Sequence, residues 1–440
     1  MTDDPPPVRP LAVPARRLSR ARRIGGLAGG LLGNIAWNGA AELSRGRRPR
    51  FNDLLMTPGN MRRVADELAH MRGAAMKLGQ LISMDAGDVM PKELADVFAR
   101  LRADAHFMPP AQLKKVLDAN WPKGWIQQFE PFDTRPIAAA SIGQVHRVRT
   151  REGRDLAVKV QYPGVADSIE SDVANLGLLV RASGLLPKSF DLAPYLEEAR
   201  AQLRDETDYD REARALVRFA QLLDGESAFA VPELAAEWSG PSILAMSFMD
   251  SVPVEDAQTA PQEERDRIAR RLVSLTLREL FEFGVMQTDP NYANYRYQPE
   301  TGRIVLLDFG ATMDIAPEIT ALYRRLLRAG LRDDSDALEA AASGLGLLSP
   351  DMAERHRAKL LSMIEEVMRS VRETDMYECA DPSLPQRLQA EGMALAEDGL
   401  APPQVPMQVL FIQRKLGGIY SLAARLRARV PIRSLLEAWV

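Results

Sequence analysis

The chain reads Met286-Gln-Thr-Asp289-Pro-Asn-Tyr-Ala-Asn294 and then Ile304-Val-Leu-Leu-Asp308-Phe-Gly310. An Asp, an Asn five residues later and an apolar, strand-like run that ends in Asp-Phe-Gly are typical of the phosphate-handling half of a kinase site. Phosphoryl transfer needs a positioned base and metal ions that neutralise charge. We therefore expect Asp289 to position the nucleophile, and Asn294 and Asp308 to supply oxygen ligands for Mg²⁺ on ATP.

A site of this kind also needs a lysine on an upstream strand, where it holds the α- and β-phosphates. Lys159 lies in the β-branched run Ala157-Val-Lys-Val160, which fits such a strand. A glutamate on a following helix should pair with the lysine, and the helical stretch 203–212 offers several carboxylates. We expect Glu206 to form this ion pair. The alternatives are a surface lysine on an amphipathic strand and a solvated acidic helix face.

The place of a Gly-rich phosphate loop is taken by Pro136-Ile-Ala138-Ala139-Ala140-Ser141-Ile-Gly143. Alanines stand where glycines would let the backbone wrap the phosphates closely. Their Cβ atoms stiffen the turn, so phosphate geometry and nucleotide selectivity should differ from those of ordinary kinases. Ala138, Ala139, Ala140 and Ser141 remain our candidates for nucleotide contacts.

The segment after Asp308-Phe-Gly310 is short. Only Ala311–Ala316 separates it from Pro317, where we expect a helix to start because proline suits the first helical turn. A protein kinase has a long activation segment at this point, on which peptide substrates dock. Little room remains here for such a platform.

Together these features resemble the UbiB-like atypical kinases, also called aarF-domain kinase-like proteins. Lys77-Leu-Gly-Gln80 matches the family's Lys-x-Gly-Gln motif, and Glu206-Thr-Asp208 matches its Glu-x-Asp motif. The Ala-rich loop with Ser141–His146 matches the family's replacement for the Gly-rich loop, and Met286–Asn291 looks like the coenzyme Q branch. The resemblance runs from about residue 50 to about residue 430.

The resemblance implies a bilobal, protein-kinase-like α+β fold, mostly helical, with an added N-terminal helical domain that covers the active site. It places Lys77 and Gln80 at the nucleotide pocket, near Glu206 and Asp208. It also implies Mg²⁺-dependent ATP hydrolysis in support of ubiquinone biosynthesis, stimulated by membrane lipid and by phenolic quinone precursors. Because Lys77 and Gln80 lie three positions apart, they would share one helix face.

We expect four segments along the chain. They are a basic, partly disordered extension (1–50), a helical segment with Lys-x-Gly-Gln (51–130), an N-lobe with a helical insertion (131–250) and a helical C-lobe (251–440). Residues 131–165 are predicted to form strands and 165–201 to form helix. Beyond residue 250 we expect helix almost everywhere except 295–310.

Charge is unevenly distributed. Residues 1–50 contain ten Arg and three acidic residues, which gives about +7, so the remainder of a chain of net charge −4 carries about −11. This asymmetry favours contact of the N-terminus with an anionic membrane, and it gives no general nucleic-acid signature. The Gly-rich stretch around 24–43 either contacts the membrane or packs as an ordinary helix. We expect a cytoplasmic protein, peripheral on the inner face of a bacterial membrane.

One cysteine and four scattered histidines provide neither a disulfide framework nor a zinc site. Our leading hypothesis is an ATPase that uses ATP and Mg²⁺, with quinone-precursor phenols, anionic lipids and ubiquinone-biosynthesis enzymes as partners. The alternatives are a nucleotide-binding scaffold without turnover and a true protein kinase, which the short segment after Gly310 disfavours.

Overall fold

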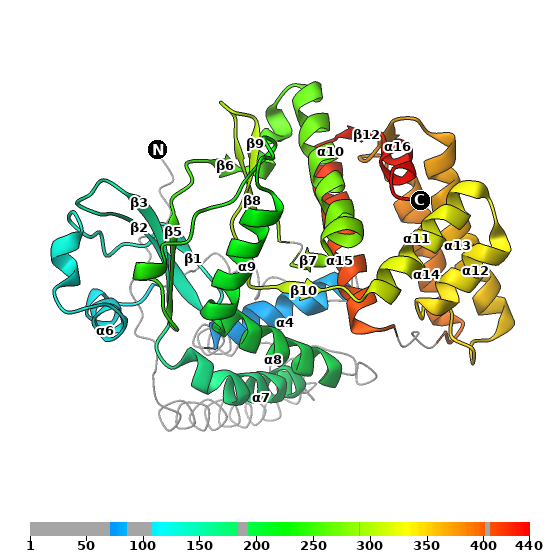
Figure 1. The fold of residues 1–440 in the computed structure, drawn as a ribbon. Helices are drawn as coiled ribbons and strands as arrows, with labels where there is room; N and C mark the ends of the chain where they lie inside the picture. The colour runs from blue at the N-terminus through cyan, green and yellow to red at the C-terminus, as the bar shows by residue number, and fades with distance from the viewer. Residues whose placement is uncertain (1–70, 86–106, 184–191, 290, 401–404) are drawn as a thin grey trace, which may run out of the picture. The chain divides into compact units, whose positions relative to one another are not determined.

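The computed structural model describes residues 71–85, 107–183, 192–289, 291–400 and 405–440 (Figure 1). They divide into two compact units. The first contains the described residues up to Arg214 together with Glu233–Phe248, and the second contains Ala215–Pro232 and Met249–Val440. The expected N-terminal extension 1–50, with its stretch 24–43, lies outside the described residues.

The first unit is built on an antiparallel sheet with the order β1-β2-β3-β5. Its central hairpin joins two seven-residue strands in which buried and more exposed residues largely alternate, as expected for a sheet with one face on a core. This confirms the strands predicted within 131–165. The strands are β1 (Ala138–Ala139), β2 (Gly143–Arg149), β3 (Asp155–Gln161) and β5 (Ile243–Ser247).

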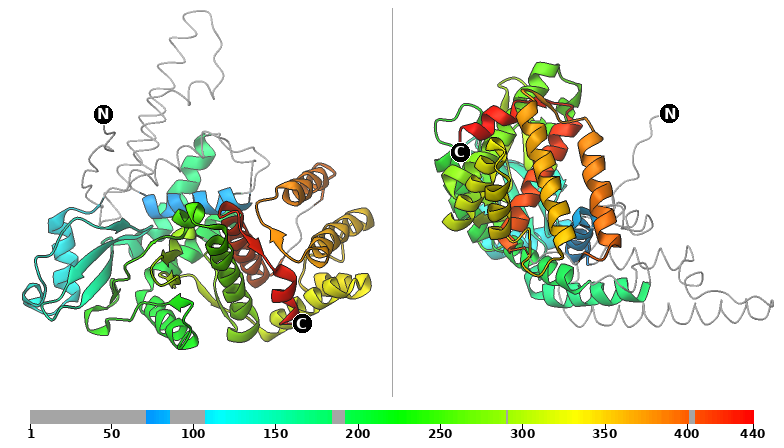
Figure 2. Two further views of the ribbon diagram at one scale, coloured as in Figure 1. Left: turned by 90° about the horizontal axis from the view of Figure 1, so that it is seen from above. Right: turned by 90° about the vertical axis from the view of Figure 1, so that its right-hand side faces the viewer.

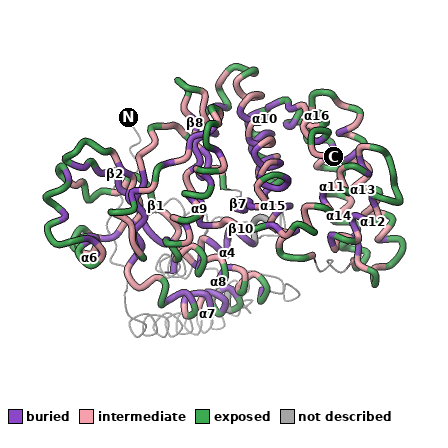
Figure 3. The backbone as a smooth tube through the Cα atoms, in the orientation of Figure 1, coloured by how far each residue is buried: buried purple, intermediate pink, exposed green. Residues whose placement is uncertain are grey.

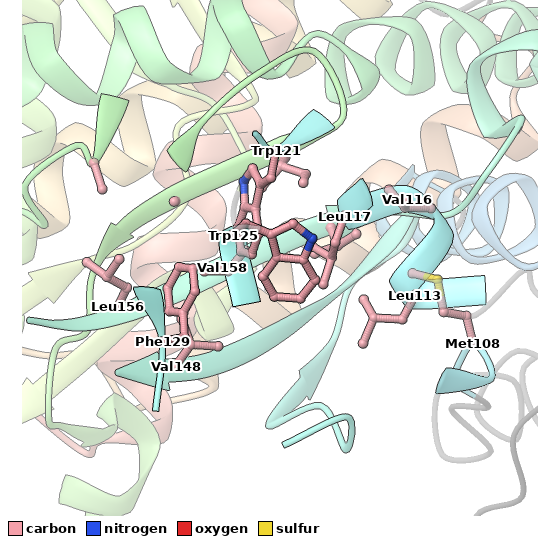
Figure 4. Packing of buried hydrophobic residues seen from close by; sticks show 14 of the residues in the cluster. Met108, Leu113, Val116, Leu117, Trp121, Trp125, Phe129, Val148, Leu156 and Val158 are labelled. Carbon is pink, nitrogen blue, oxygen red and sulfur yellow. The ribbon is translucent and has the colours of Figure 1, made fainter. Parts of the chain in front are cut away.

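An aromatic cluster fills the core of this unit (Figure 4). The ring of Trp121 stacks on Phe129 with centroids 5.1 Å apart, and it meets Trp125 edge-on at 5.0 Å. Strand residues such as Val158 belong to the same cluster. Rings of this size remove much apolar area from water, so the cluster is a main source of stability for the sheet that carries Lys159.

Helices complete the first unit. α4 packs on α7 and α8, which run beside each other (Figure 1). The helix predicted over 165–201 is confirmed in the described residues of that range by α7 and α8. α9 begins in this unit and continues into the second. The helices are α4 (Arg72–Asp85), α6 (Pro110–Asn120), α7 (Val165–Ser183), α8 (Ala193–Thr207) and α9 (Tyr209–Leu222), with 3₁₀ turns at Trp125–Gln128 and Ala236–Trp238.

The second unit contains a four-stranded sheet of order β4-β9-β8-β6 and two short strand pairs, β7–β10 and β11–β12. Beyond residue 250, the prediction of strands only at 295–310 was incomplete, because strands of two or three residues are too short to show alternation. The strands are β4 (Phe229–Ala230), β6 (Val252–Pro253), β7 (Val285–Gln287), β8 (Tyr295–Gln298), β9 (Arg303–Leu306), β10 (Thr312–Asp314), β11 (Tyr377–Glu378) and β12 (Arg429–Val430).

The remainder of the second unit is helical, as predicted. α11 packs on α12 and α13, and α13 packs on α14 (Figure 2). Buried residues follow one side of α10 and α15 (Figure 3). The helices are α10 (Gln262–Arg278), α11 (Pro317–Arg332), α12 (Ser335–Gly344), α13 (Glu354–Glu373), α14 (Ser383–Glu397), α15 (Met407–Arg425) and α16 (Ile432–Glu437), with a π-helical turn at Glu279–Phe283 and 3₁₀ turns at Val254–Thr259 and Tyr292–Asn294.

Within the described ranges, no helix is both long and apolar enough to cross a lipid bilayer.

Candidate nucleotide site

Lys159 lies on β3, between β2 and β5, where it faces Val145 and Leu244 across the sheet. Its Nζ lies 2.9 Å and 3.0 Å from the two carboxylate oxygens of Glu212. Glu212 is 2% exposed and stands in the first turn of α9, where the helix dipole also favours negative charge. The pair has the form of the lysine–glutamate ion pair that orients nucleotide phosphates in kinases.

The expected ion pair between Lys159 and Glu206 was wrong. The sequence suggests one helix over 203–212, but α8 ends at Thr207 and α9 begins at Tyr209. Glu206 therefore lies in the last turn of one helix and Glu212 in the first turn of the next. The signal for this break was Asp208, a good N-cap residue, whose Oδ1 accepts a hydrogen bond from the Arg211 backbone N–H at 2.8 Å.

Glu206 instead pairs with Lys77 on α4, with Nζ and Oε1 2.7 Å apart. Its other carboxylate oxygen accepts a hydrogen bond from Ser141 Oγ in the Ala-rich loop. Lys77 is 5% exposed, and a lysine buried to this extent needs a carboxylate partner. The expected proximity of Lys77 and Glu206 is thus confirmed. Gln80 stands on the same helix, and its side chain lies outside the described part of the structure.

The Ala-rich loop consists of the short strand β1 and the tight turn that follows it into β2. Ala138 and Ala139 pair with β2, and the N–H of Ala140 donates to Gly143 O at 2.9 Å. α4 lies directly against this turn, because a Cβ placed on Gly73 would come within 3.1 Å of Ser141 O. A Cβ on Gly143 would lie 2.4 Å from Val160 O, so only glycine permits this approach of β2 to the lysine strand. The loop, Lys77 and Lys159 therefore belong to one connected part of the first unit.

In the second unit, Asp289 and Asn294 bracket the turn between β7 and β8. The Asn294 Nδ2 donates to Asp289 Oδ2 at 3.0 Å, and the Asn291 backbone N–H donates to Asp289 Oδ1 at 3.2 Å. Asn291 also caps the 3₁₀ turn through the Ala293 N–H. Because its amide nitrogen is bound to Asp289, the amide oxygen of Asn294 is the atom suited to a metal.

The β8–β9 hairpin brings Asn294 and Asp308 to one end of the sheet. Tyr295 pairs with Leu306, and the Leu307 N–H donates to Asn294 O at 3.2 Å. Asp308 follows Leu307 and accepts the Gly310 N–H at 3.0 Å. Hydrogen bonds join Asp289 to Asn294, and backbone pairing places Asp308 at the same end of the hairpin, so the three residues predicted for base and metal lie in one region of the second unit.

The segment after Asp308 runs back to Thr288, the residue before Asp289. The backbone N–H and the hydroxyl of Thr288 both donate to Ala311 O, at 2.8 Å and 2.7 Å. The Phe309 ring packs on Phe219 of α9 with centroids 5.0 Å apart. α11 then begins at Pro317, with the proline in its first turn. The predicted helix start is confirmed, and a strand of three residues, β10, occupies much of the short connection.

The donor set fits Mg²⁺ bound to a nucleotide. Asn294 and Asp308 offer amide and carboxylate oxygens, which are the ligands that this ion prefers. Among the described residues, no group of three or more His, Cys, Asp or Glu side chains is placed to hold a metal ion. In phosphoryl-transfer sites, Mg²⁺ is usually held by one or two protein ligands, and phosphates and water complete its coordination.

A lysine–glutamate pair on a small sheet, together with an Asp, Asn and Asp-Phe-Gly set on a second, mostly helical unit, defines the kinase-like class of proteins. The family comparison agrees: residues 100–342 match the ABC1 atypical kinase-like domain. The chain belongs to this family. The family, the mostly helical α+β fold of the kinase-like type and the prediction of an atypical kinase-like enzyme are confirmed.

The chain is 37% identical to the atypical kinase COQ8 of Saccharomyces cerevisiae, a mitochondrial protein, over 97% of this chain and 85% of that protein. It is 35% identical to the mitochondrial atypical kinase COQ8B of Rattus norvegicus, over 97% of this chain and 80% of that protein. Among solved structures it is similar to Rv3197 of Mycobacterium tuberculosis, determined with erythromycin. The TM-score is 0.60 at 25% identity, with 85% of this chain and 93% of that one covered.

Proposed function

We propose that the protein is an atypical kinase-like ATPase that uses Mg-ATP in support of ubiquinone biosynthesis. The observation that carries the proposal is the hydrogen-bonded pair of Asp289 and Asn294, with Asp308 at the same end of the β8–β9 hairpin. The COQ8 names of its relatives support the biosynthetic role. The second observation is the ion pair of Lys159 with Glu212, which gives the ammonium a fixed position for phosphate oxygens.

Each residue has a distinct role in this proposal. Asp289 orients a water molecule and accepts its proton, while Asn294 and Asp308 hold Mg²⁺, which neutralises charge on the phosphates. Lys159 binds the α- and β-phosphates, and Glu212 keeps its ammonium in place. Glu212 replaces Glu206 in this role.

The remaining residues predicted to contact the nucleotide lie in the Ala-rich loop, on α4 and at the end of α8. Ala138–Ser141 line the nucleotide as a stiff turn, and Glu206 joins that turn to Lys77 of α4. Asp208 and Gln80 complete the nucleotide surroundings. Because only Ala311–Ala316 separates Gly310 from the start of α11, little room remains for a peptide platform, and the favoured acceptor of the phosphoryl group is water or a small hydroxyl compound.

The partners and the location follow from the same reasoning. Anionic lipids would contact the basic residues 1–50, and phenolic quinone precursors would bind near the site and stimulate turnover. We place the protein on the cytoplasmic face of a bacterial membrane, as a peripheral protein beside the enzymes of ubiquinone biosynthesis. The four segments proposed from the sequence remain our proposal for its domain organisation.

The test follows the γ-phosphoryl group of labelled ATP. Purified full-length protein is incubated with Mg²⁺, with and without liposomes of anionic lipid and a simple phenol. We expect label to appear as inorganic phosphate, faster with liposomes, and almost none on added proteins. Efficient labelling of peptides without ATP hydrolysis would contradict the proposal. Bound nucleotide without any turnover would favour the scaffold instead.

A further inference from the structure

A fully buried charge cluster contacts both ends of the segment that carries Asp289 and Asn294. Lys415 of α15 and Glu279 of the π-helical turn are each 1% exposed, and their Nζ and Oε2 atoms lie 3.2 Å apart. Lys415 Nζ also donates to Gln287 O at 2.8 Å and to Tyr295 Oη at 2.6 Å. A third hydrogen bond, to Gln287 Oε1 at 3.3 Å, uses the last donor of the ammonium, and Glu279 supplies its countercharge.

The two neutral partners of Lys415 stand at the two ends of one functional segment. Gln287 is the last residue of β7 and lies two positions before Asp289. Tyr295 is the first residue of β8 and follows Asn294 directly. One ammonium group therefore fixes the start and the end of the 288–294 segment relative to a helix more than one hundred residues further along the chain.

A contribution to stability does not by itself explain why this buried lysine–glutamate pair is present. Removing two charges from water costs about as much as their attraction returns, and apolar side chains of similar size often serve equally well. Burial alone would lower the pKa of Lys415, but Glu279 and Tyr295 raise it above its usual value, so the side chain remains an ammonium. A charge kept in this position instead provides directed hydrogen bonds with a fixed geometry.

We propose that Lys415 is a positioning residue that sets the spacing of Asp289 and Asn294 by holding Gln287 O and Tyr295 Oη. It touches neither nucleotide nor metal in this account and acts through the segment between its two partners. The role in turnover rests on the proposed ATPase function, whereas the ordering of residues 288–294 does not. The sequence of α15 contains a signal of this positioning role, because Lys415 interrupts an apolar stripe of Ile412, Ile419 and Leu422.

The test compares Tyr295→Phe with Tyr297→Phe. Both tyrosines are buried on β8, at 3% and 2% exposure, but the Tyr297 hydroxyl donates to Glu264 of α10 at 2.5 Å. Each variant therefore removes one tyrosine hydroxyl from β8, but only the hydroxyl of Tyr295 is bonded to Lys415. Lys415→Met and the Lys415→Met, Tyr295→Phe double variant complete the set.

Two readouts are taken on full-length protein. Backbone hydrogen exchange of residues 288–296 is measured without nucleotide, and kcat and the Mg²⁺ concentration for half-maximal rate are measured with ATP. For Tyr295→Phe we expect faster exchange in this segment and a loss of about 10- to 100-fold in kcat or Mg²⁺ affinity, as is usual for residues that orient metal ligands. Tyr297→Phe should leave both unchanged. The double variant should be no worse than Lys415→Met.

A folded Tyr295→Phe protein whose exchange and kinetics equal those of Tyr297→Phe would overturn the assignment, even where Lys415→Met fails to fold. An equal loss of kcat in both tyrosine variants would also overturn it, because the effect would then be general. If the wild type hydrolyses no ATP, the proposed function fails, and the exchange comparison still decides the role of Lys415.

Discussion

The ammonium of Lys159 is bound by both carboxylate oxygens of Glu212, at 2.9 Å and 3.0 Å. Glu206, six residues earlier, serves a different lysine, Lys77. One lysine–glutamate pair therefore joins β3 to α9, and the other joins α4 to α8. Their separation makes the roles of the two glutamates distinguishable by experiment.

Glu212→Gln should raise the KM for ATP and lower kcat/KM by about 10- to 100-fold, because a charge-assisted hydrogen bond contributes about 1.5–3 kcal/mol. The variant should also unfold more easily, since Lys159 is only 12% exposed and would lack its countercharge. Steady-state kinetics and thermal unfolding measure the two effects. Glu206→Gln is the matched control, and a larger rise in KM for that variant would show that our pairing is wrong.

Lys77→Met and Ser141→Ala should not have additive effects on the free energy of unfolding. Both side chains bind one carboxylate, that of Glu206, so the loss of one changes how much the other contributes to the free energy of unfolding. A double-mutant cycle by urea unfolding should give a coupling of about 1 kcal/mol or more. Additive single effects would mean that α4 and the Ala-rich loop are not joined through Glu206.

Trp121→Ala should lower the free energy of unfolding of the first unit by about 3–5 kcal/mol, because the ring is buried among four other aromatic groups. Ile126→Ala offers a control in the same region. That side chain is 55% exposed, and its loss should change stability by about 0.5 kcal/mol or less. Urea unfolding followed by tryptophan fluorescence measures both. Similar losses for the two variants would contradict the packing shown in Figure 4.

His146 should make the first unit less stable in mild acid. Burial lowers the pKa of this histidine, while its hydrogen bond with Asp133 O opposes the shift. The Gln144 side chain accepts the Met108 N–H through its oxygen, so its amide nitrogen faces His146 Nε2 at 2.7 Å. Nε2 must therefore accept, which fixes the neutral ring with its proton on Nδ1.

Because the folded-state pKa of His146 is depressed, the unfolded chain binds the extra proton first as the pH falls. The contribution of the neutral ring is fully present above about pH 6.5, the usual histidine pKa, and is lost progressively as the pH falls from there toward the lower folded-state value. Urea unfolding at pH 7.5 and pH 5.5 should show this loss in the wild type and a smaller one in His146→Gln. An identical pH dependence in both proteins would remove His146 as the cause.

Sequence alone predicted the parts of the site that depend on local patterns. Lys159 on a strand, Asp308 after an apolar strand and the helix start at Pro317 each follow from short-range signals, namely β-branched residues and proline at a first helical turn. Glu212 was not identified, because which of several carboxylates meets Lys159 depends on a helix break of one residue. Lys415 was missed for a related reason, since its partners lie more than one hundred residues away.

The resemblance to a known family contributed what local patterns did not. Lys77 carries no local signal of function, and its expected place near Glu206 came from the Lys-x-Gly-Gln motif. The link of Glu206 to Ser141 was not foreseen, because it requires α4, α8 and the Ala-rich loop to meet. Contacts among three elements are a tertiary property that periodicity does not encode.

The most direct test of the account is ADP formation from Mg-ATP by purified wild type and by Asp308→Asn, with bound nucleotide measured in the same samples. Asn keeps the shape of the side chain but removes the charge that Mg²⁺ needs. We predict steady ADP formation by the wild type and a loss of about 100-fold or more in Asp308→Asn, in keeping with the few kcal/mol of charge stabilisation that a catalytic metal provides. Equal rates in the two proteins, with nucleotide bound by both, would contradict the claim that this site hydrolyses ATP.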